Sequence, residues 1–350
     1  MGIYGQHWEP SRAAALERLD AFLPHAGRDY QERRNFDLGP EDRGNVSLLS
    51  PHIRLRQLSE PEVIKCVLHR HSRQAAFKFI QEVCWRTYWK GWLELRPSIW
   101  GDFLDQAETA RQSWQNDDTY KQATEGRTGI QAFDSWVHEL TGTGYLHNHA
   151  RMWFASIWIF TLRLPWSLGA AFFLRHLIDG DAASNTLGWR WVAGLQTRGK
   201  HYLASASNIK KFTGGRFNPH GQLNERAEPE VDATPLPAPK SLAQLPPAVP
   251  SGRTGYLIHE DDLTVDQWLL DVPVSSLAGL CASDFDAGFP LDAKVQAFRS
   301  RALDEALERM KEYTHTRPHY LTGSDPVSAV VEWARNENLD TLICARPFTG

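Results

Sequence analysis

The 350-residue sequence is poor in cysteine, and it lacks both a long apolar run and an apolar leader. Its four cysteines are scattered, without Cys-x-x-Cys spacing. This argues against a disulfide framework and against a zinc or iron–sulfur site, and it fits a reducing cytoplasm. The first residues hold no apolar segment of the kind a secretory signal needs. The longest apolar stretch, residues 152–164, contains Arg163 and ends at Pro165, so it is too short to span a bilayer. We expect a cytoplasmic protein with no metal site and no membrane segment.

Tryptophan, by contrast, is abundant, and charge is unevenly distributed. Of 14 tryptophans, only Trp268 and Trp333 lie beyond residue 191. Because tryptophan favours cores and interfaces, this predicts an aromatic-rich interior in the first part of the chain. Residues 1–220 carry a net charge of +5 and residues 221–350 one of −9. A polyanionic partner would therefore bind the first part.

A proline-rich segment at residues 226–253 divides the sequence and reads as a semi-rigid linker. Before it, residues 11–24, 60–95 and 153–178 have helical patterns, the last broken at Leu164-Pro165. After it, strands predicted at 254–262, 319–324 and 339–345 alternate with helices at 293–312 and 325–336. We expect a mainly α protein, with an all-helical domain over 1–225 and a small Rossmann-like α/β domain over 254–350.

Residues 179–191 read DGDAASNTLGWRW and follow an apolar, helical stretch. Gly180 and Gly188 permit backbone turns, so we expect Asp179, Asp181 and Asn185 to lie in a loop or at helix caps. One interpretation is an ordinary polar helix cap followed by two core tryptophans. The other is a polar binding site backed by those tryptophans.

Three further stretches carry candidate site residues. Within residues 77–95, Glu82, Trp85 and Arg86 share one helix face, which is either a salt bridge beside a core tryptophan or a functional face. Residues 47–50 offer hydroxyl and backbone N–H groups before a helix, as phosphate cradles do. Gly142 and Gly144 should break two helices, and His147 and His149 should point to opposite sides of a helix, which disfavours a metal pair.

The 179–191 string resembles the flavin-contacting loop of the DNA photolyase/cryptochrome family. The family pattern D-G-D-x-A-x-N-x-x-G-W-x-W is matched at every fixed position. The resemblance extends over about residues 10–220 and implies an all-helical FAD-binding domain. Leu48 stands where many members have a basic residue, and Gln131 where members often have proline. The family's α/β antenna domain precedes its flavin domain, whereas here an α/β segment follows, as if the halves were exchanged. No antenna-chromophore motif is present, so that cofactor stays open.

The resemblance also implies roles for individual residues. FAD would be held by Tyr30, Ser47, Leu49, Ser50, Arg86, Lys90, Asn148, Arg151, Asp179, Asp181 and Asn185. Arg151 would pair with Asp179, and Asn185 would face the flavin. The lesion would meet Glu82, Trp85, Asn148, Met152 and Trp191, with Glu82 protonated in an apolar pocket. Electrons would pass from the surface through Trp114, Trp166 and Trp189. DNA phosphates would be contacted by Arg34, His149, Lys210, Lys211 and Arg216.

The activity implied by the resemblance is that of a deoxyribodipyrimidine photolyase, a carbon–carbon lyase. Reduced FAD would absorb light and pass an electron to a cyclobutane pyrimidine dimer in DNA. Asn148 and Met152 favour this lesion, because members that repair (6-4) photoproducts have histidine at both positions. We expect a monomer, and one hypothesis is a preference for single-stranded DNA. The alternatives are a cryptochrome-like flavin photoreceptor without repair activity and a remnant that binds no FAD.

Overall fold

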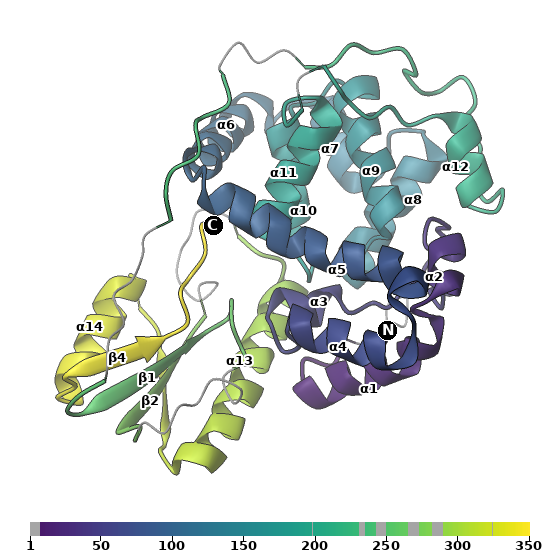
Figure 1. Cartoon of the computed structure of the whole chain (residues 1–350). Helices are drawn as coiled ribbons and strands as arrows, with labels where there is room; N and C mark the ends of the chain where they lie inside the picture. Colours follow the sequence, from purple (N-terminus) through teal and green to yellow (C-terminus); the bar gives the residue numbers. More distant parts are fainter. Residues whose placement is uncertain are drawn as a thin grey trace.

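A computed structural model describes residues 8–197, 199–230, 235–242, 250–264, 273–281, 290–323 and 325–350. Most of these residues are helical, and a small parallel sheet lies at one end of the molecule (Figure 1). The mainly helical class with a small α/β portion is therefore confirmed. None of the helices within these ranges is long and apolar enough to cross a membrane.

The helical part comprises the helices that precede the proline-rich segment. They are α1 (Arg12–Phe22), η1 (Leu23–His25), α2 (Arg28–Arg33), α3 (Ser50–Arg54), α4 (Glu60–Arg70), α5 (Arg73–Glu94), α6 (Ser98–Trp114), α7 (Asp118–Glu125), α8 (Gln131–Thr143), α9 (Asn148–Ser156), η2 (Ile157–Thr161), α10 (Trp166–His176), α11 (Ala182–Ala193) and α12 (Ala206–Phe212). Ser11, Ser59 and Ser72 cap α1, α4 and α5 by accepting a hydrogen bond from the backbone N–H three residues on.

Several predicted helix boundaries need correction. The helical stretch 60–95 is two helices, because α4 ends at Arg70 and Ser72 starts α5. Gly142 lies inside α8, and only Gly144 ends it, with a left-handed φ of 73°. Gly188 lies inside α11 and makes no turn. The break at Leu164-Pro165 is confirmed, since η2 ends at Thr161 and α10 begins at Trp166.

The aromatic interior predicted for the first part of the chain is present. Trp136, Trp153 and Trp158 are fully buried in one hydrophobic cluster built from α6 to α12. Trp136 stacks on Trp153, with ring centroids 5.5 Å apart. This cluster supports the side of α11 that faces the interior, and so fixes the orientation of that helix.

The α/β part consists of strands β1 (Thr254–His259), β2 (Ser276–Leu280), β3 (Pro318–Leu321) and β4 (Thr341–Cys344) with helices α13 (Ala293–Thr314) and α14 (Pro326–Asn336). All the strand pairs are parallel, and the strand order is β3-β2-β1-β4. Strand β2 was not predicted, because SLAGL has no β-branched residue. Its Gly279 allows close approach of α13, since a Cβ there would lie 2.6 Å from Leu307.

The two parts share a hydrophobic core. Leu55, Tyr145 and Ile178 of the helical part lie in one cluster with residues of β1, β2 and α13. The Leu263 N–H donates to the carbonyl of Leu55 at 2.9 Å. Of the predicted linker, residues 231–234 and 243–249 lie outside the described residues. Lys240, in the described remainder, donates its N–H to the carbonyl of Leu95 at 2.7 Å.

Candidate functional site

Asp179 and Asp181 flank Gly180 in the loop between α10 and α11, as predicted. Asp179 Oδ2 accepts a hydrogen bond from Arg151 Nη2 of α9 at 2.8 Å, which is the pair that the resemblance implied. Asp181 caps α11 through its Oδ1, which accepts from the Ser184 N–H at 2.9 Å. A Cβ on Gly180 would lie 2.9 Å from the carbonyl oxygen of Leu177, so no other residue fits here without a shift.

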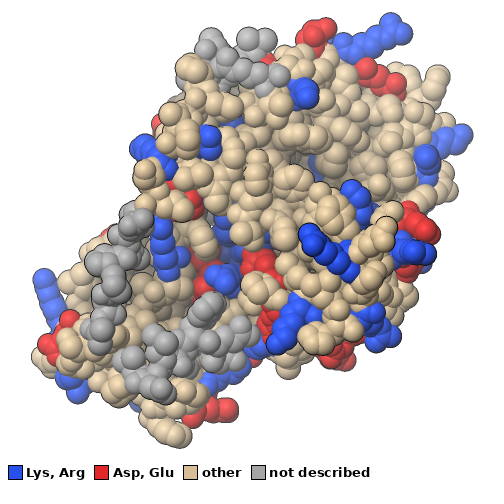
Figure 2. All heavy atoms as spheres, viewed as in Figure 1, with Lys and Arg blue, Asp and Glu red and all other residues tan. Residues whose placement is uncertain are grey.

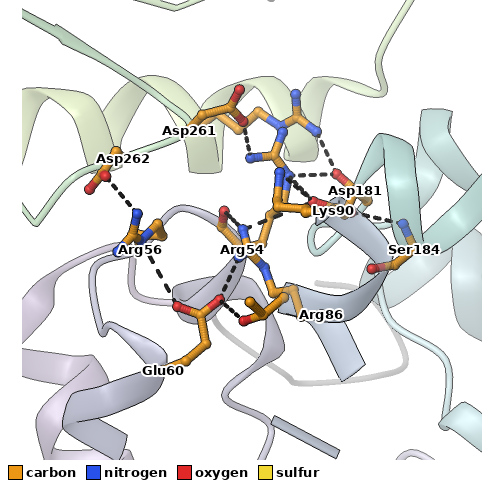
Figure 3. A network of polar contacts seen from close by, with 12 residues as sticks. Arg54, Arg56, Glu60, Arg86, Lys90, Asp181, Ser184, Asp261 and Asp262 are labelled. Carbon is orange, nitrogen blue, oxygen red and sulfur yellow. Dashed lines mark hydrogen bonds and ion pairs between the residues drawn. The ribbon is translucent and has the colours of Figure 1, made fainter. Parts of the chain in front are cut away.

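Three cations from the helical part surround the Asp181 carboxylate (Figure 3). Lys90 Nζ lies 3.0 Å from Asp181 Oδ2, and nitrogens of Arg54 and Arg86 lie 3.9 Å from the same oxygen. Burial by itself would raise the pKa of Asp181, but Lys90, Arg86 and Arg54 outweigh it and hold the pKa well below its usual range. Burial lowers the pKa of Lys90, and the attraction of Asp181 opposes this shift.

The network extends from these cations into the α/β part. Arg54 Nη1 lies 2.6 Å from Asp261 Oδ1, just after β1, and Arg56 Nη1 lies 2.8 Å from Asp262 Oδ2. Glu60 Oε1 accepts from Arg86 Nη1 at 2.8 Å. In the space-filling view, acidic and basic side chains meet along the junction of the two parts (Figure 2).

One face of α11 stays accessible although the helix is otherwise internal. Leu187, Trp189 and Val192 are buried, whereas Asn185 and Trp191 are half-buried. These two residues share a face with Gly188, and a Cβ on Gly188 would meet nothing within 4 Å. The Asn185 amide donates to the carbonyl of Ala170 at 2.9 Å, which fixes its orientation.

Unpartnered polar atoms at this place fit a polar ligand such as FAD. Oδ1 of Asp179 and Nε of Arg86 are buried, and neither has a hydrogen-bond partner among the described residues. Buried polar atoms are rarely left unpaired, so each atom is a candidate contact for a bound group. Together with the space beside Gly188, they make the loop, α5 and α11 a suitable site for the cofactor.

The accessible surface of α5 carries Trp85, whose side chain is 41% exposed and stacks on Trp89 with ring centroids 5.9 Å apart. Glu82 forms an ion pair with Arg34. Glu82 therefore does not lie in the apolar pocket expected for it, because its carboxyl group is paired with an arginine. Arg34, predicted as a phosphate contact, is held by this pair.

At the start of α9, Asn148 is exposed and Met152 is half-buried on the same face. His147 and His149 do not point to opposite sides of a helix, so that prediction is wrong. His147 Nε2 lies 3.1 Å from the carbonyl oxygen of Arg34, and His149 Nδ1 lies 3.0 Å from that of Asn35. Both rings reach the same segment because His147 is the N-cap of α9 and lies outside its helical turns. His149 also stacks on Trp153 at 4.1 Å, so its ring has limited freedom.

The three tryptophans predicted to relay electrons belong to one aromatic region. Trp189 and Trp166 are buried, Trp114 is half-buried, and all three pack in the same hydrophobic cluster. A Cβ on Gly169 would lie 2.2 Å from Trp189, so α10 and α11 touch there. Exposure therefore increases from Trp189 and Trp166 to Trp114, the outermost of the three.

The remaining predicted cofactor residues lie around α2, α3 and α5. Tyr30 packs edge-on against Phe79 with ring centroids 5.1 Å apart, and burial raises the pKa of its phenol. Leu49 is buried, whereas Ser47 is half-buried and Ser50 is exposed. The short helix α3 begins at Ser50, as the phosphate-cradle interpretation requires.

The remaining residues predicted to contact DNA are Lys210 and Lys211, at the end of α12, and Arg216, four residues beyond it. All three are exposed. Arg216 Nη2 also lies 3.0 Å from Asp37 Oδ2, so its head group is partly committed. No group of three or more metal-binding side chains occurs within the described ranges.

Arg54, Arg299 and Asp261 were not predicted for this site. They were missed because no local pattern marks them, and two of them belong to the α/β part. A cavity of about 760 Å³ lies between the two parts, at the ends of β1, β2 and β4. Arg54, Arg299 and Gly180 line it, so it adjoins the acidic loop.

Comparison with known proteins finds a family that matches part of this chain. Residues 79–247 match the family described as the FAD binding domain of DNA photolyase. A deoxyribodipyrimidine photo-lyase from Agrobacterium fabrum is 32% identical over 64% of this chain and 46% of its own length. One from Thermus thermophilus is 34% identical over 66% of this chain and 53% of its own length. The chain thus spans about half the length of these relatives.

Among solved structures, a class III photolyase from Agrobacterium tumefaciens is similar, with a TM-score of 0.51 and 30% identity. The similarity covers 60% of this chain and 44% of that one. The region matched by the family holds most of α5, the acidic loop and α11, which together form the site described above. Residues 79–247 of this chain are thus a member of the FAD-binding domain family of DNA photolyases.

Proposed function

We propose that this protein is a flavin-dependent photolyase that repairs cyclobutane pyrimidine dimers in DNA. The accessible face of α11 carries the proposal, because Asn185, Gly188 and Trp191 follow the acidic loop on the open side of an internal helix. When bound there, reduced FAD supplies the light absorption and the electron that splits the dimer.

The residues of the loop and of α5 would hold the cofactor. Arg86 and Lys90 are cations suited to a diphosphate, and Arg86 has a free buried Nε. Arg151 orients the Asp179 side chain and leaves Asp179 Oδ1 available to a donor. The Asn185 amide, fixed by Ala170, would face the flavin rings and tune their protonation.

The exposed aromatic surface would receive the lesion. Photolyases are among the enzymes that take their target base out of the stack. Trp85 and Trp191 would form the walls for the flipped dimer. Met152 and Asn148 would contact the lesion from α9. Glu82 and Arg34 together offer a donor and an acceptor for the pyrimidine edges. Exposed Lys210 and Lys211 would contact backbone phosphates.

We infer that the chain has two domains. Helices α1–α12 form the catalytic domain, and the α/β part is a relative of the family's antenna domain that follows the catalytic domain instead of preceding it. The four-stranded parallel sheet supports this inference. We also infer that the protein is a monomer and that it prefers single-stranded DNA. Gel filtration tests the oligomeric state, and matched single-stranded and duplex substrates test the preference.

Illumination of the purified protein with a dimer-containing oligonucleotide tests the activity. We expect a yellow protein with a flavin spectrum, and restoration of monomeric thymine in blue or near-ultraviolet light but not in darkness. The Trp85→Ala variant and the dark reaction are the controls. If the reduced, flavin-bound protein restored no thymine in light, repair would be rejected in favour of a photoreceptor. If it bound no flavin, both functions would be rejected.

A further inference from the structure

The carbonyl oxygen of Gly180, between Asp179 and Asp181, accepts hydrogen bonds from two arginines of different parts of the molecule. Arg54 Nε, from the end of α3, lies 2.9 Å from this oxygen. Arg299 Nη2, from α13 of the α/β part, lies 3.1 Å from it. The α/β part therefore contacts the loop that carries the two carboxylates of the flavin site.

Each arginine is anchored by an acidic residue that follows β1. Arg299 Nη1 donates to Glu260 Oε1 at 3.0 Å, and Arg54 Nη1 donates to Asp261 Oδ1 at 2.6 Å. Arg54 and Arg299 are each 7% exposed. Charge-assisted hydrogen bonds between buried groups are strong and directional, so the two guanidinium groups are fixed donors.

The loop itself has little freedom once these donors are in place. The Gly180 N–H donates to the carbonyl of Leu177 at 3.0 Å, so both ends of this peptide segment are tied. A flip of the peptide unit between Gly180 and Asp181 would break both arginine contacts. It would also turn Asp181 away from Lys90, because the two groups are joined through the backbone of this loop.

We propose that Arg299 is a positioning residue of the flavin site. It holds the Gly180 carbonyl from the α/β part and thereby keeps Asp179 and Asp181 oriented toward the cofactor. It does not touch the cofactor itself. This inference rests on the proposed function, since it concerns how well the chain binds FAD.

Four variants on α13 separate this role from simple docking of the two parts. Arg299→Gln removes the positive charge and the paired N–H donors of the guanidinium group. Arg299→Lys keeps the charge but cannot donate to Gly180 and Glu260 with the same geometry. Phe298→Ala weakens the shared core beside His52 without touching the loop. Arg301→Gln, at an exposed position on the same helix, is the neutral control.

The experiment measures the FAD dissociation constant and the flavin reduction potential at a temperature where each variant is folded. The melting temperature of the flavin-free protein is measured separately by heating. We expect Arg299→Gln to weaken FAD binding about tenfold and to shift the potential, with Arg299→Lys intermediate. Phe298→Ala should lower the melting temperature and leave the dissociation constant within about twofold.

Equal FAD affinity for wild type and Arg299→Gln would overturn the inference and leave the proposed function intact. An equal loss of affinity in Phe298→Ala and Arg299→Gln would also overturn it, because docking alone would then explain the effect. Failure of the wild-type protein to bind FAD would overturn the inference together with the proposed function.

Discussion

The Lys90 ammonium lies between the carboxylate of Asp181 and the ring of Phe348. Its Nζ is 3.0 Å from Asp181 Oδ2 and 4.5 Å from the Phe348 ring centroid. Lys90 belongs to α5 and Asp181 caps the start of α11, so this pair joins the two helices that border the proposed flavin site. Both side chains are buried, which makes the pair sensitive to loss of either partner.

Replacing Lys90 with methionine should destabilise the protein by about 3 kcal/mol, because Asp181 stays buried with only the more distant Arg54 and Arg86 as cationic neighbours. Urea unfolding measures the change. Lys121→Met, at an exposed position, should change stability by less than about 0.5 kcal/mol. Equal effects in the two variants would show that the Lys90–Asp181 pair contributes nothing specific.

Replacing Trp85 with alanine should weaken binding of dimer-containing DNA about tenfold, because the stacking wall for the flipped bases is lost. Stability should change little, since the Trp85 side chain is 41% exposed. Fluorescence anisotropy with a labelled oligonucleotide measures the affinity. Tyr88→Ala is the matched control, as Tyr88 is exposed on the same helix and touches Trp85. Our assignment of the lesion site fails if Tyr88→Ala weakens binding as strongly.

Replacing Gly188 with alanine should have opposite effects on the flavin-free and flavin-bound protein. A Cβ there meets nothing within 4 Å, so the flavin-free protein should be stabilised by about 0.5–1 kcal/mol through a better helix residue. FAD should bind less tightly, because the added methyl enters the space beside Asn185. Calorimetric melting with and without FAD tests both effects. Gly91→Ala on α5, where a Cβ also meets nothing, controls for helix propensity. An equal gain in stability of the flavin-free and the flavin-bound protein would show that the cofactor does not bind beside Gly188.

Stability should fall in mild acid. Burial lowers the pKa of His52, His147 and His176 to about 4, whereas histidine in an unfolded chain titrates near 6.5. The folded state therefore favours the neutral rings, and its advantage is complete above about pH 6.5 and lost as the pH falls toward 4.

The His52→Gln variant should make this acid decline shallower, because one of the buried titrating groups is removed. Urea unfolding at several pH values between 4 and 7 measures the slope. His69→Gln, at an exposed position, should leave the slope unchanged. A wild-type stability that stays flat across this range would contradict the assignment of neutral buried histidines.

Sequence alone determined the local features of this protein. The string DGDAASNTLGWRW predicted that Asp179 and Asp181 lie in a loop or at a helix cap, as they do, whereas Asn185, predicted there too, lies inside α11. Apolar periodicity located about half of the helices, among them α1, α5 and α13. These features depend on residues a few positions apart, so they can be read from the chain. Predictions failed where local preference was weak, as in β2, or where a partner was distant, as with Arg34 beside Glu82.

The tertiary structure alone decided which distant residues keep the acidic loop in place. Arg54 and Arg299 lie 126 and 119 positions from Gly180, and no local pattern links them to it. They meet at one carbonyl because the shared core brings α13 against the helical part. Docking of two separately patterned segments depends on the shape and charge of surfaces that exist only after folding, which is why the sequence pattern did not reveal it.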